Sequence, residues 1–193
     1  MRRGLSLRLR LVLAGAVAVT LALGLAAAGL AALFATHVER RAMAELSVQL
    51  DQVLAGLAPG AEGLTLATPP ADPRFARPYG GLYWQIETGE SLLRSRSLWD
   101  VPLAMPPDMA ADLPADGQVP AHRWPGPDGA ELLVLERSVR LPARLGGGMA
   151  RAAVAVEAAE LAAARRAFVA DMVPYLALLA LALIGAGWAQ VAV

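Results

Sequence analysis

The sequence predicts an α+β fold in which two transmembrane helices flank one extracytoplasmic domain built on an antiparallel sheet. Two uncharged apolar runs, 11–36 and 172–193, each exceed the roughly 20 residues that a helix needs to cross a bilayer. Between them, short apolar runs alternate with clusters of proline, glycine and aspartate, which is typical of strands and turns. We therefore expect four parts: a cytoplasmic amino terminus at 1–10, a span at 11–36, a periplasmic domain at 37–171 and a second span at 172–193.

The composition agrees with a protein that lies partly in lipid. Hydrophobic residues make up 56% of the 193 residues, more than an ordinary soluble domain contains. The chain has no cysteine, so the exported domain has neither disulfides nor thiolate metal ligands and must rely on an apolar core. The 17 basic residues are all arginine, and the abundant alanine, glycine and proline suggest a GC-rich bacterial gene.

Charge predicts the orientation of the first span. Residues 1–10 carry four arginines and no acidic residue, and arginines beside a first span stay in the cytoplasm. A cleavable signal peptide is the alternative, but its apolar core is about 7–15 residues long, and the run at 11–36 is longer. We expect an uncleaved anchor in the bacterial inner membrane, with residues 37–171 in the periplasm.

Helices are predicted on both sides of the sheet. Leucines and valines recur at three- and four-residue spacing over 38–57 and end before Pro59 and Gly60. Residues 157–173 favour a second helix that runs into the second span. At the boundary, Pro174 is either a hinge for signal transmission or the first turn of a separate span.

The middle of the chain predicts an antiparallel sheet. Residues 88–90 suit a hairpin, and residues 125–129 suit a turn before a long strand. The order helix, sheet, helix is that of a PAS-like or Cache-like sensor. The expected strands are 64–68, 81–87, 92–99, 131–141 and 149–156, and the proline-rich stretch 106–120 is expected to be a loop or a short interrupted helix.

Three short motifs carry a resemblance to a known family. They are Asp72-Pro73-Arg74-Phe75, then Gly80 to Ile86 with its Tyr-Trp-Gln, then Leu93-Arg-Ser-Arg-Ser-Leu-Trp-Asp100. Here the chain resembles the input domains of bacterial two-component sensor histidine kinases. The resemblance implies a homodimer, a response regulator as downstream partner, and ATP and magnesium as cofactors of the parent's kinase domain.

The chain departs from that family after its second span. Such kinases continue into a HAMP-like linker, a helix with the phosphoacceptor histidine and an ATP-binding domain. The two histidines here, His37 and His122, fall outside the expected cytoplasmic part. We therefore expect no catalytic residue and no cofactor in this chain, which is either a fragment of a kinase or the product of a gene that stops early. The alternatives are the input region of a chemoreceptor or cyclase, or a stand-alone membrane interaction protein.

Arg94 and Arg96 are the candidate ligand-binding residues. In a strand over 92–99 their side chains share one face, and two guanidinium groups there could bind a carboxylate or phosphate. The alternative is that they pair with local acids such as Glu87 or Asp100. The ligand itself cannot be named.

Metal and nucleic-acid binding are not expected. Asp108, Asp112 and Asp116 recur every four residues, but Pro114 interrupts any helix that would align them.

Several aromatic residues are expected to pack in the core. One of Tyr83 and Trp84 should be core and the other at a surface or interface. Trp99 and Trp124 could line a pocket, but we expect them to fill the interior.

Contacts with lipid and with a second copy are expected in the spans. Tyr175 and Trp188 are about 20 Å apart along a helix, so they could anchor near the two membrane interfaces. Small residues recur every four positions in the first span and could form a dimer interface, although an alanine-rich composition alone produces such stripes. They are Ala14, Ala18, Ala22 and Ala26.

Overall fold

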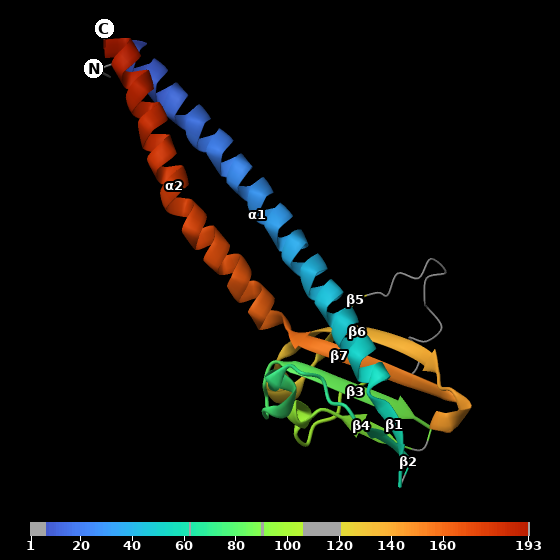
Figure 1. The fold of residues 1–193 in the computed structure, drawn as a ribbon. Coiled ribbons are helices and arrows are strands. Elements are labelled where there is room, and N and C mark those ends of the chain that lie inside the picture. Colours follow the sequence, from blue (N-terminus) through green and yellow to red (C-terminus); the bar gives the residue numbers. More distant parts are fainter. Residues whose placement is uncertain (1–6, 62, 90, 106–120, 193) are drawn as a thin grey trace. The chain divides into compact units, whose positions relative to one another are not determined.

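The computed structural model describes residues 7–61, 63–89, 91–105 and 121–192 (Figure 1). The chain divides into two compact units, one formed by Met1–Val38 with Ala163–Val193 and the other by Glu39–Ala162. Two long helices, α1 (Leu7–Ala55) and α2 (Ala158–Ala192), each contribute to both units.

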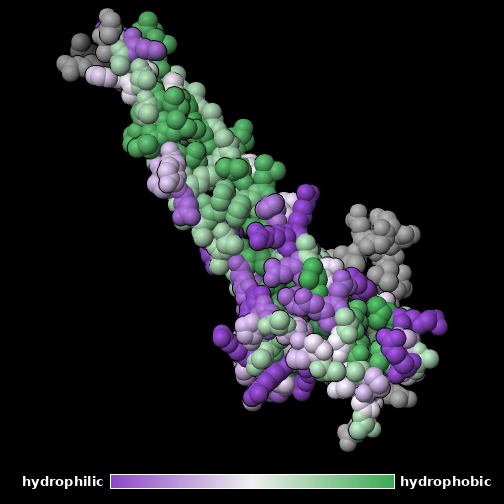
Figure 2. Space-filling model, in the orientation of Figure 1, coloured by the Kyte–Doolittle hydropathy of each residue, from purple (hydrophilic) through white to green (hydrophobic). Residues whose placement is uncertain are grey.

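The first unit consists of the apolar arms of α1 and α2. Both helices are long and apolar enough to cross a membrane, and no part of either apolar window is buried inside the protein. On the visible face, apolar side chains predominate along these arms, with a few hydrophilic patches among them (Figure 2). The rings of Phe34 and Phe168 stack with centroids 4.0 Å apart. Both helices are therefore candidate membrane spans, as the sequence predicts.

Pro174 lies near the middle of α2, which runs from Ala158 to Ala192. The interpretation that it opens a separate span is therefore wrong, since α2 already begins at Ala158. Proline has no amide N–H, so the carbonyl of Ala170 loses its usual helical partner. The expected role of Pro174 as a hinge stays a prediction.

The second unit contains an antiparallel sheet of five strands in the order β4-β3-β7-β6-β5 and a two-stranded ribbon, β1-β2. This confirms the predicted α+β fold. The predicted hairpin at 88–90 joins β3 to β4, and the turn at 125–129 precedes the long strand β6. The strands are β1 (Leu57–Gly60), β2 (Gly63–Leu66), β3 (Leu82–Thr88), β4 (Leu92–Arg94), β5 (Ala121–Pro125), β6 (Glu131–Arg140) and β7 (Met149–Glu157).

The first and last strands of the five-stranded sheet pair with each other. β3 lies against β7 over seven residue pairs, from Leu82 opposite Val156 to Thr88 opposite Ala150. The ladder continues past the strand ends, because the Glu157 amide donates to the Gly81 carbonyl over 3.0 Å. The start of β3 is thereby held beside the start of α2.

The sheet is covered on both faces, so it has two apolar clusters. On one face, Leu46, Leu50 and Val53 of α1 pack against residues that include Trp84 and Ile86. The other cluster is Tyr83, Leu98, Leu103, Trp124, Leu132, Val134, Ala153 and Ala155. Tyr83 and Trp84 are therefore both buried. The expectation that one of them would lie at a surface or interface is wrong within this chain, because neither face is open to water at this strand. Trp124 is in the core, as predicted.

The predicted strand over 92–99 is wrong beyond its first half. β4 ends at Arg94, and Arg96–Leu98 form the 3₁₀ turn η2. The exposed side chain of Trp99 is 53% accessible, so this residue does not fill the interior. Its φ of 51° is uncommon for a bulky residue.

Three other parts of the chain differ from the predictions or lie outside the described residues. α1 ends at Ala55, and Pro59 and Gly60 belong to strand β1 instead of a turn. Strand β5 was not predicted, because its His122-Arg123-Trp124 run lacks an alternating apolar pattern. The expected loop 106–120, with Asp108, Asp112 and Asp116, lies outside the described residues.

The buried face of α1 should carry much of the stability of the sheet unit. Leu50 is fully buried, whereas Val48 on the same helix is 56% exposed. Leu50→Ala should lower the free energy of unfolding by about 2–5 kcal/mol through lost burial and a new cavity. Val48→Ala, the control, should change it by less than about 0.5 kcal/mol. Urea titration of the chain in detergent, followed by tryptophan fluorescence, measures both. Equal effects would mean that α1 does not pack on the sheet in this way.

Candidate functional site

The Asp72-Pro73-Arg74-Phe75 motif forms a tight turn that is closed by its own side chains. Asp72 precedes the 3₁₀ turn η1 (Pro73–Ala76) and accepts a hydrogen bond from the Arg74 amide at 2.9 Å. The Arg74 guanidinium also donates to the Asp72 carboxylate, with Nη2 2.8 Å from Oδ2 and Nε within 3.2 Å of both oxygens. Phe75 is buried against the α1 face of the sheet. The motif thus holds Arg74 in one orientation above a fixed core residue.

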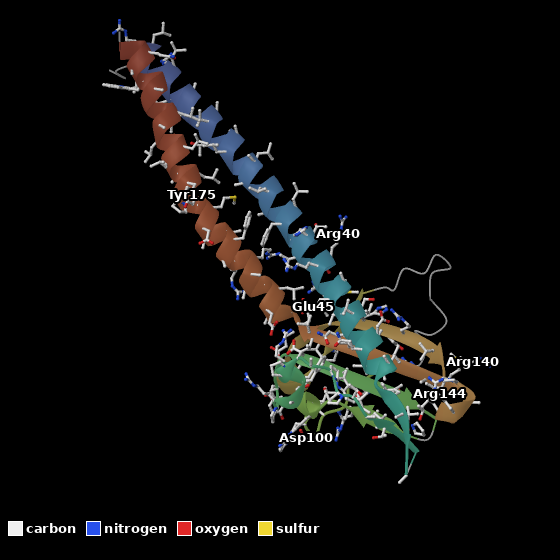
Figure 3. All side chains as sticks on the ribbon, viewed as in Figure 1. Arg40, Glu45, Asp100, Arg140, Arg144 and Tyr175 are labelled. Carbon is white, nitrogen blue, oxygen red and sulfur yellow. The ribbon has the colours of Figure 1, made fainter. Side chains whose placement is uncertain are left out.

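Arg74 connects this turn to both long helices. Its Nη1 donates to Glu160 Oε2, in the first turn of α2, over 3.1 Å. Its Nη2 lies 3.8 Å from Glu45 Oε1 on α1, which Figure 3 labels where that helix meets the sheet. We call Glu45, Asp72, Arg74 and Glu160 the junction cluster. One guanidinium therefore contacts carboxylates from three separate segments of the chain.

Two glycines make room for the junction cluster. A Cβ on Gly80 would lie 2.1 Å from the Arg74 carbonyl oxygen, closer than atoms can approach. Gly81 has φ of +82°, and a Cβ there would lie 2.7 Å from Glu160 Oε1. The pair of glycines before the Tyr-Trp-Gln strand thus allows the loop, β3 and α2 to approach closely.

The serines of the Arg-Ser-Arg-Ser motif fasten the neighbouring turn to β3. Ser95 Oγ accepts from the Trp84 amide at 3.0 Å, and Ser97 Oγ donates to the Leu82 carbonyl at 2.7 Å. The two hydroxyls are 2.8 Å apart. These bonds satisfy β3 backbone groups where the β4 ladder stops, so the chain can leave the strand after Arg94 without leaving these groups unpaired.

The junction cluster holds more negative than positive charge. The hydrogen bond from Arg74 lowers the pKa of Asp72, and the same partner raises the pKa of Arg74. The pKa of Glu160 is raised chiefly by its partial removal from water, with further contributions from the nearby carboxylates of Glu157, Asp72 and Glu45. Arg74 opposes that shift. Arg74 is thus the main cause of the shift at Asp72, whereas at Glu160 it only partly offsets the effect of burial.

Glu157, at the end of β7, has a separate partner on the other face of the sheet. The Tyr83 hydroxyl donates to Glu157 Oε1 over 2.7 Å, and burial raises the pKa of Tyr83. The residues around the start of α2 are thus held from both faces of the sheet.

The structure does not bring Arg94 and Arg96 together on one strand face. Arg94 ends β4 and Arg96 begins η2, and both side chains are exposed. Within the described part of the chain neither forms an ion pair, and Glu87 instead lies 3.9 Å from Arg151. The predicted arrangement, with both arginines on one face of a single strand, is therefore wrong. Anion binding by either residue stays a prediction.

The sequence predicts no functional role for Glu45 or Glu160, and Arg74 enters the predictions only as part of a motif. A signal for Glu160 did exist, since an acidic residue in the first turn of a helix is typical of a helix start. No local pattern marks Glu45, because it is 29 residues from Arg74 in the sequence and its contact depends on the packing of α1 on the sheet.

The ionisation of Asp72 should make the stability of the unit depend on pH. Because its pKa is lower in the folded chain than the ordinary value of 3.8, its stabilising contribution is present above that value and is lost as the pH falls through the folded pKa. Asp72→Asn should cost about 1 kcal/mol at pH 7, at the low end for a charged hydrogen bond because 31% of the Arg74 side chain is exposed. It should also flatten the acid limb of a plot of unfolding free energy against pH.

Glu131→Gln is the matched control, since Glu131 pairs with Arg123 at 3.1 Å with both side chains more than half exposed. It should leave the acid limb unchanged. Identical profiles for the two variants would contradict the role of Asp72.

Comparison with known proteins gives one partial similarity. A stretch of 74 residues, 38% of this chain, is 35% identical to the protein named Sensor protein kinase CarS of Pseudomonas aeruginosa. The stretch covers 17% of that protein, so the chain spans only a small part of its relative's length. No known protein family matches the chain, and no solved structure matches it. The similarity supports a distant relationship to sensor kinases.

Proposed function

We propose that this chain is the signal-input region of a membrane-bound sensor histidine kinase. In this proposal the amino terminus is cytoplasmic, residues 37–171 are periplasmic, and the spans at 11–36 and 172–193 lie in the bacterial inner membrane. The periplasmic domain is PAS-like or Cache-like. It passes an external signal, as a displacement of α2 relative to α1, to a cytoplasmic kinase module.

The junction cluster is the observation that carries this proposal. Arg74 contacts Glu160 at the start of α2 and Glu45 on α1, and both helices continue into candidate spans. A movement of the Asp72–Phe75 turn would therefore change the contacts of both helices at once. Helix shifts of about 1–2 Å are within the known range of such switches.

The proposal extends to partners outside this chain. The kinase module would use ATP and magnesium and would transfer phosphate to a response regulator, and the helices would assemble into a homodimer in contact with membrane lipid. A chemoreceptor or cyclase input region would share the same helices and domain. The similarity to a sensor kinase favours the kinase.

Removing the charge of Arg74 should uncouple the domain from the helices. A chimera would join residues 1–193 to the cytoplasmic part of a sensor kinase, and autophosphorylation would be measured in membrane vesicles. Arg74→Gln should change the basal rate about fivefold or more, as expected for a coupling free energy of 1–3 kcal/mol. Arg123→Gln, which breaks the exposed pair with Glu131, should stay within about twofold. An Arg74→Gln chimera that is folded and indistinguishable from the parent chimera would contradict signal transmission through the junction.

The proposed homodimer predicts a periodic pattern of cross-linking in the first span. Because the chain has no cysteine, single cysteines can be introduced without background. Ala18→Cys, on the stripe of small residues, should form a disulfide-linked dimer in membranes under mild oxidation, since small residues allow close helix approach. Ala16→Cys, on the opposite side of the same helix turn, is the control and should cross-link much less. Equal cross-linking at both positions would contradict this interface.

A further inference from the structure

Three turns meet at the end of the sheet that lies opposite the start of α2. They are the β1–β2 turn, the β3–β4 turn and the β6–β7 turn, and together they line a pocket of about 720 Å³. The β7 residue in its wall is Met149, at the start of the strand whose other end is Glu157. A nine-residue strand spans about 30 Å, so this turn pocket is distinct from the junction cluster. Its volume is within the range of small-molecule sites.

Glycine keeps the turn pocket open. Six of its fourteen lining residues are glycines. Gly146, Gly147 and Gly148 follow one another with φ of +90°, +69° and +84°, a backbone course that residues with side chains rarely adopt. One wall of the pocket is therefore bare main chain. A Cβ added to Gly148 or Gly89 would meet nothing within 4 Å.

The turn pocket is lined by both polar and apolar side chains. Arg144 is the charged side chain among the lining residues, and it is exposed. No carboxylate in the described part of the chain lies within 4.0 Å of it, unlike Arg74, Arg123, Arg137 and Arg151. The hydroxyls of Thr88 and Ser91 are 2.8 Å apart and already bonded to each other. Among the described side chains that line the pocket, the guanidinium of Arg144 is thus the charged group available to a ligand.

The remaining wall is aliphatic, with Leu64, Leu141, Leu145 and Met149 among the lining residues. A planar guanidinium matches a carboxylate with two parallel hydrogen bonds, and the aliphatic side chains match a short hydrocarbon body. An inorganic anion would leave this apolar surface unused, and an amine would meet the positive charge of Arg144.

We propose that the turn pocket binds a small monocarboxylate with an aliphatic body, with Arg144 as the carboxylate-binding residue. The site that we infer is separate from Arg94 and Arg96, which do not line this pocket. It does not depend on the proposed signalling role, since binding can be measured without any kinase.

Hexanoate is a suitable probe for the whole chain in lipid nanodiscs. Saturation-transfer NMR, with empty nanodiscs subtracted, should give a saturable signal. Arg144→Gln should weaken binding about tenfold or more through loss of the charged hydrogen bonds. Arg140→Gln removes an exposed arginine at the same end of the sheet (Figure 3) that does not line the pocket, and it should stay within about twofold.

A second substitution tests the pocket itself. Gly89→Leu adds a side chain to a lining position where the backbone has no left-handed φ, so it should fill the pocket and weaken hexanoate binding without strain. Tryptophan fluorescence would check that both variants are folded. In the sequence the turns also contain Glu62 and Glu90, outside the described residues, and Glu62→Gln with Glu90→Gln should leave binding equal or tighter.

Four results would overturn the proposal. They are a hexanoate signal no larger than that of empty nanodiscs, unchanged binding in Arg144→Gln or Gly89→Leu, equally strong binding of inorganic phosphate or hexylamine, and a loss of binding when Glu62 and Glu90 are neutralised. None of these results would alter the expected behaviour of the Arg74→Gln chimera, so the two proposals can fail separately.

Discussion

The antiparallel pairing of β3 with β7 is the constraint on which the rest of this architecture depends. Seven residue pairs join the first strand of the five-stranded sheet to the last, so segments about 70 residues apart in the chain become central neighbours. The pairing aligns Gly81 with Glu157, and it therefore holds the turn before β3 against the first turn of α2. This register places Arg74 close enough to Glu160 to form an ion pair. A shift of one residue would move every β3 side chain to the other face of the sheet.

Apolar burial and ion pairs both hold the sheet-proximal parts of α1 and α2 to the sheet. Leu46, Leu50 and Val53 hold α1 to the sheet by burial, which is worth several kcal/mol for such a set. The contacts from Arg74 to Glu160 and Glu45 are partly exposed ion pairs, and each contributes about 0–1 kcal/mol. Leu161 of α2 also packs against the apolar cluster, so the ion pairs add to burial where the helices meet the sheet.

The motifs that carry the resemblance to sensor kinases turn out to build the junction. Asp72 and Arg74 close a turn, Gly80 and Gly81 allow close approach, and Ser95 with Ser97 ties the next turn to β3. Asp72 and Arg74 thus join the domain to its helices, and Ser95 and Ser97 join its turn to the sheet. The turn pocket lies at the other end of β7, outside the three motifs that carry the resemblance. Its glycine-rich turns have no pattern that predicts a binding site.

The sequence by itself determined the apolar helices, the central antiparallel sheet and most turns, because these follow from local periodicity, charge and proline and glycine positions. It also located Trp124 in the core. Only the tertiary structure decided that both Tyr83 and Trp84 are buried, that the chain leaves β4 after Arg94, and that Arg74 meets Glu45 and Glu160. These features depend on which segments cover each face of the sheet and on the β3–β7 register, and such long-range contacts leave no pattern in the residues nearby.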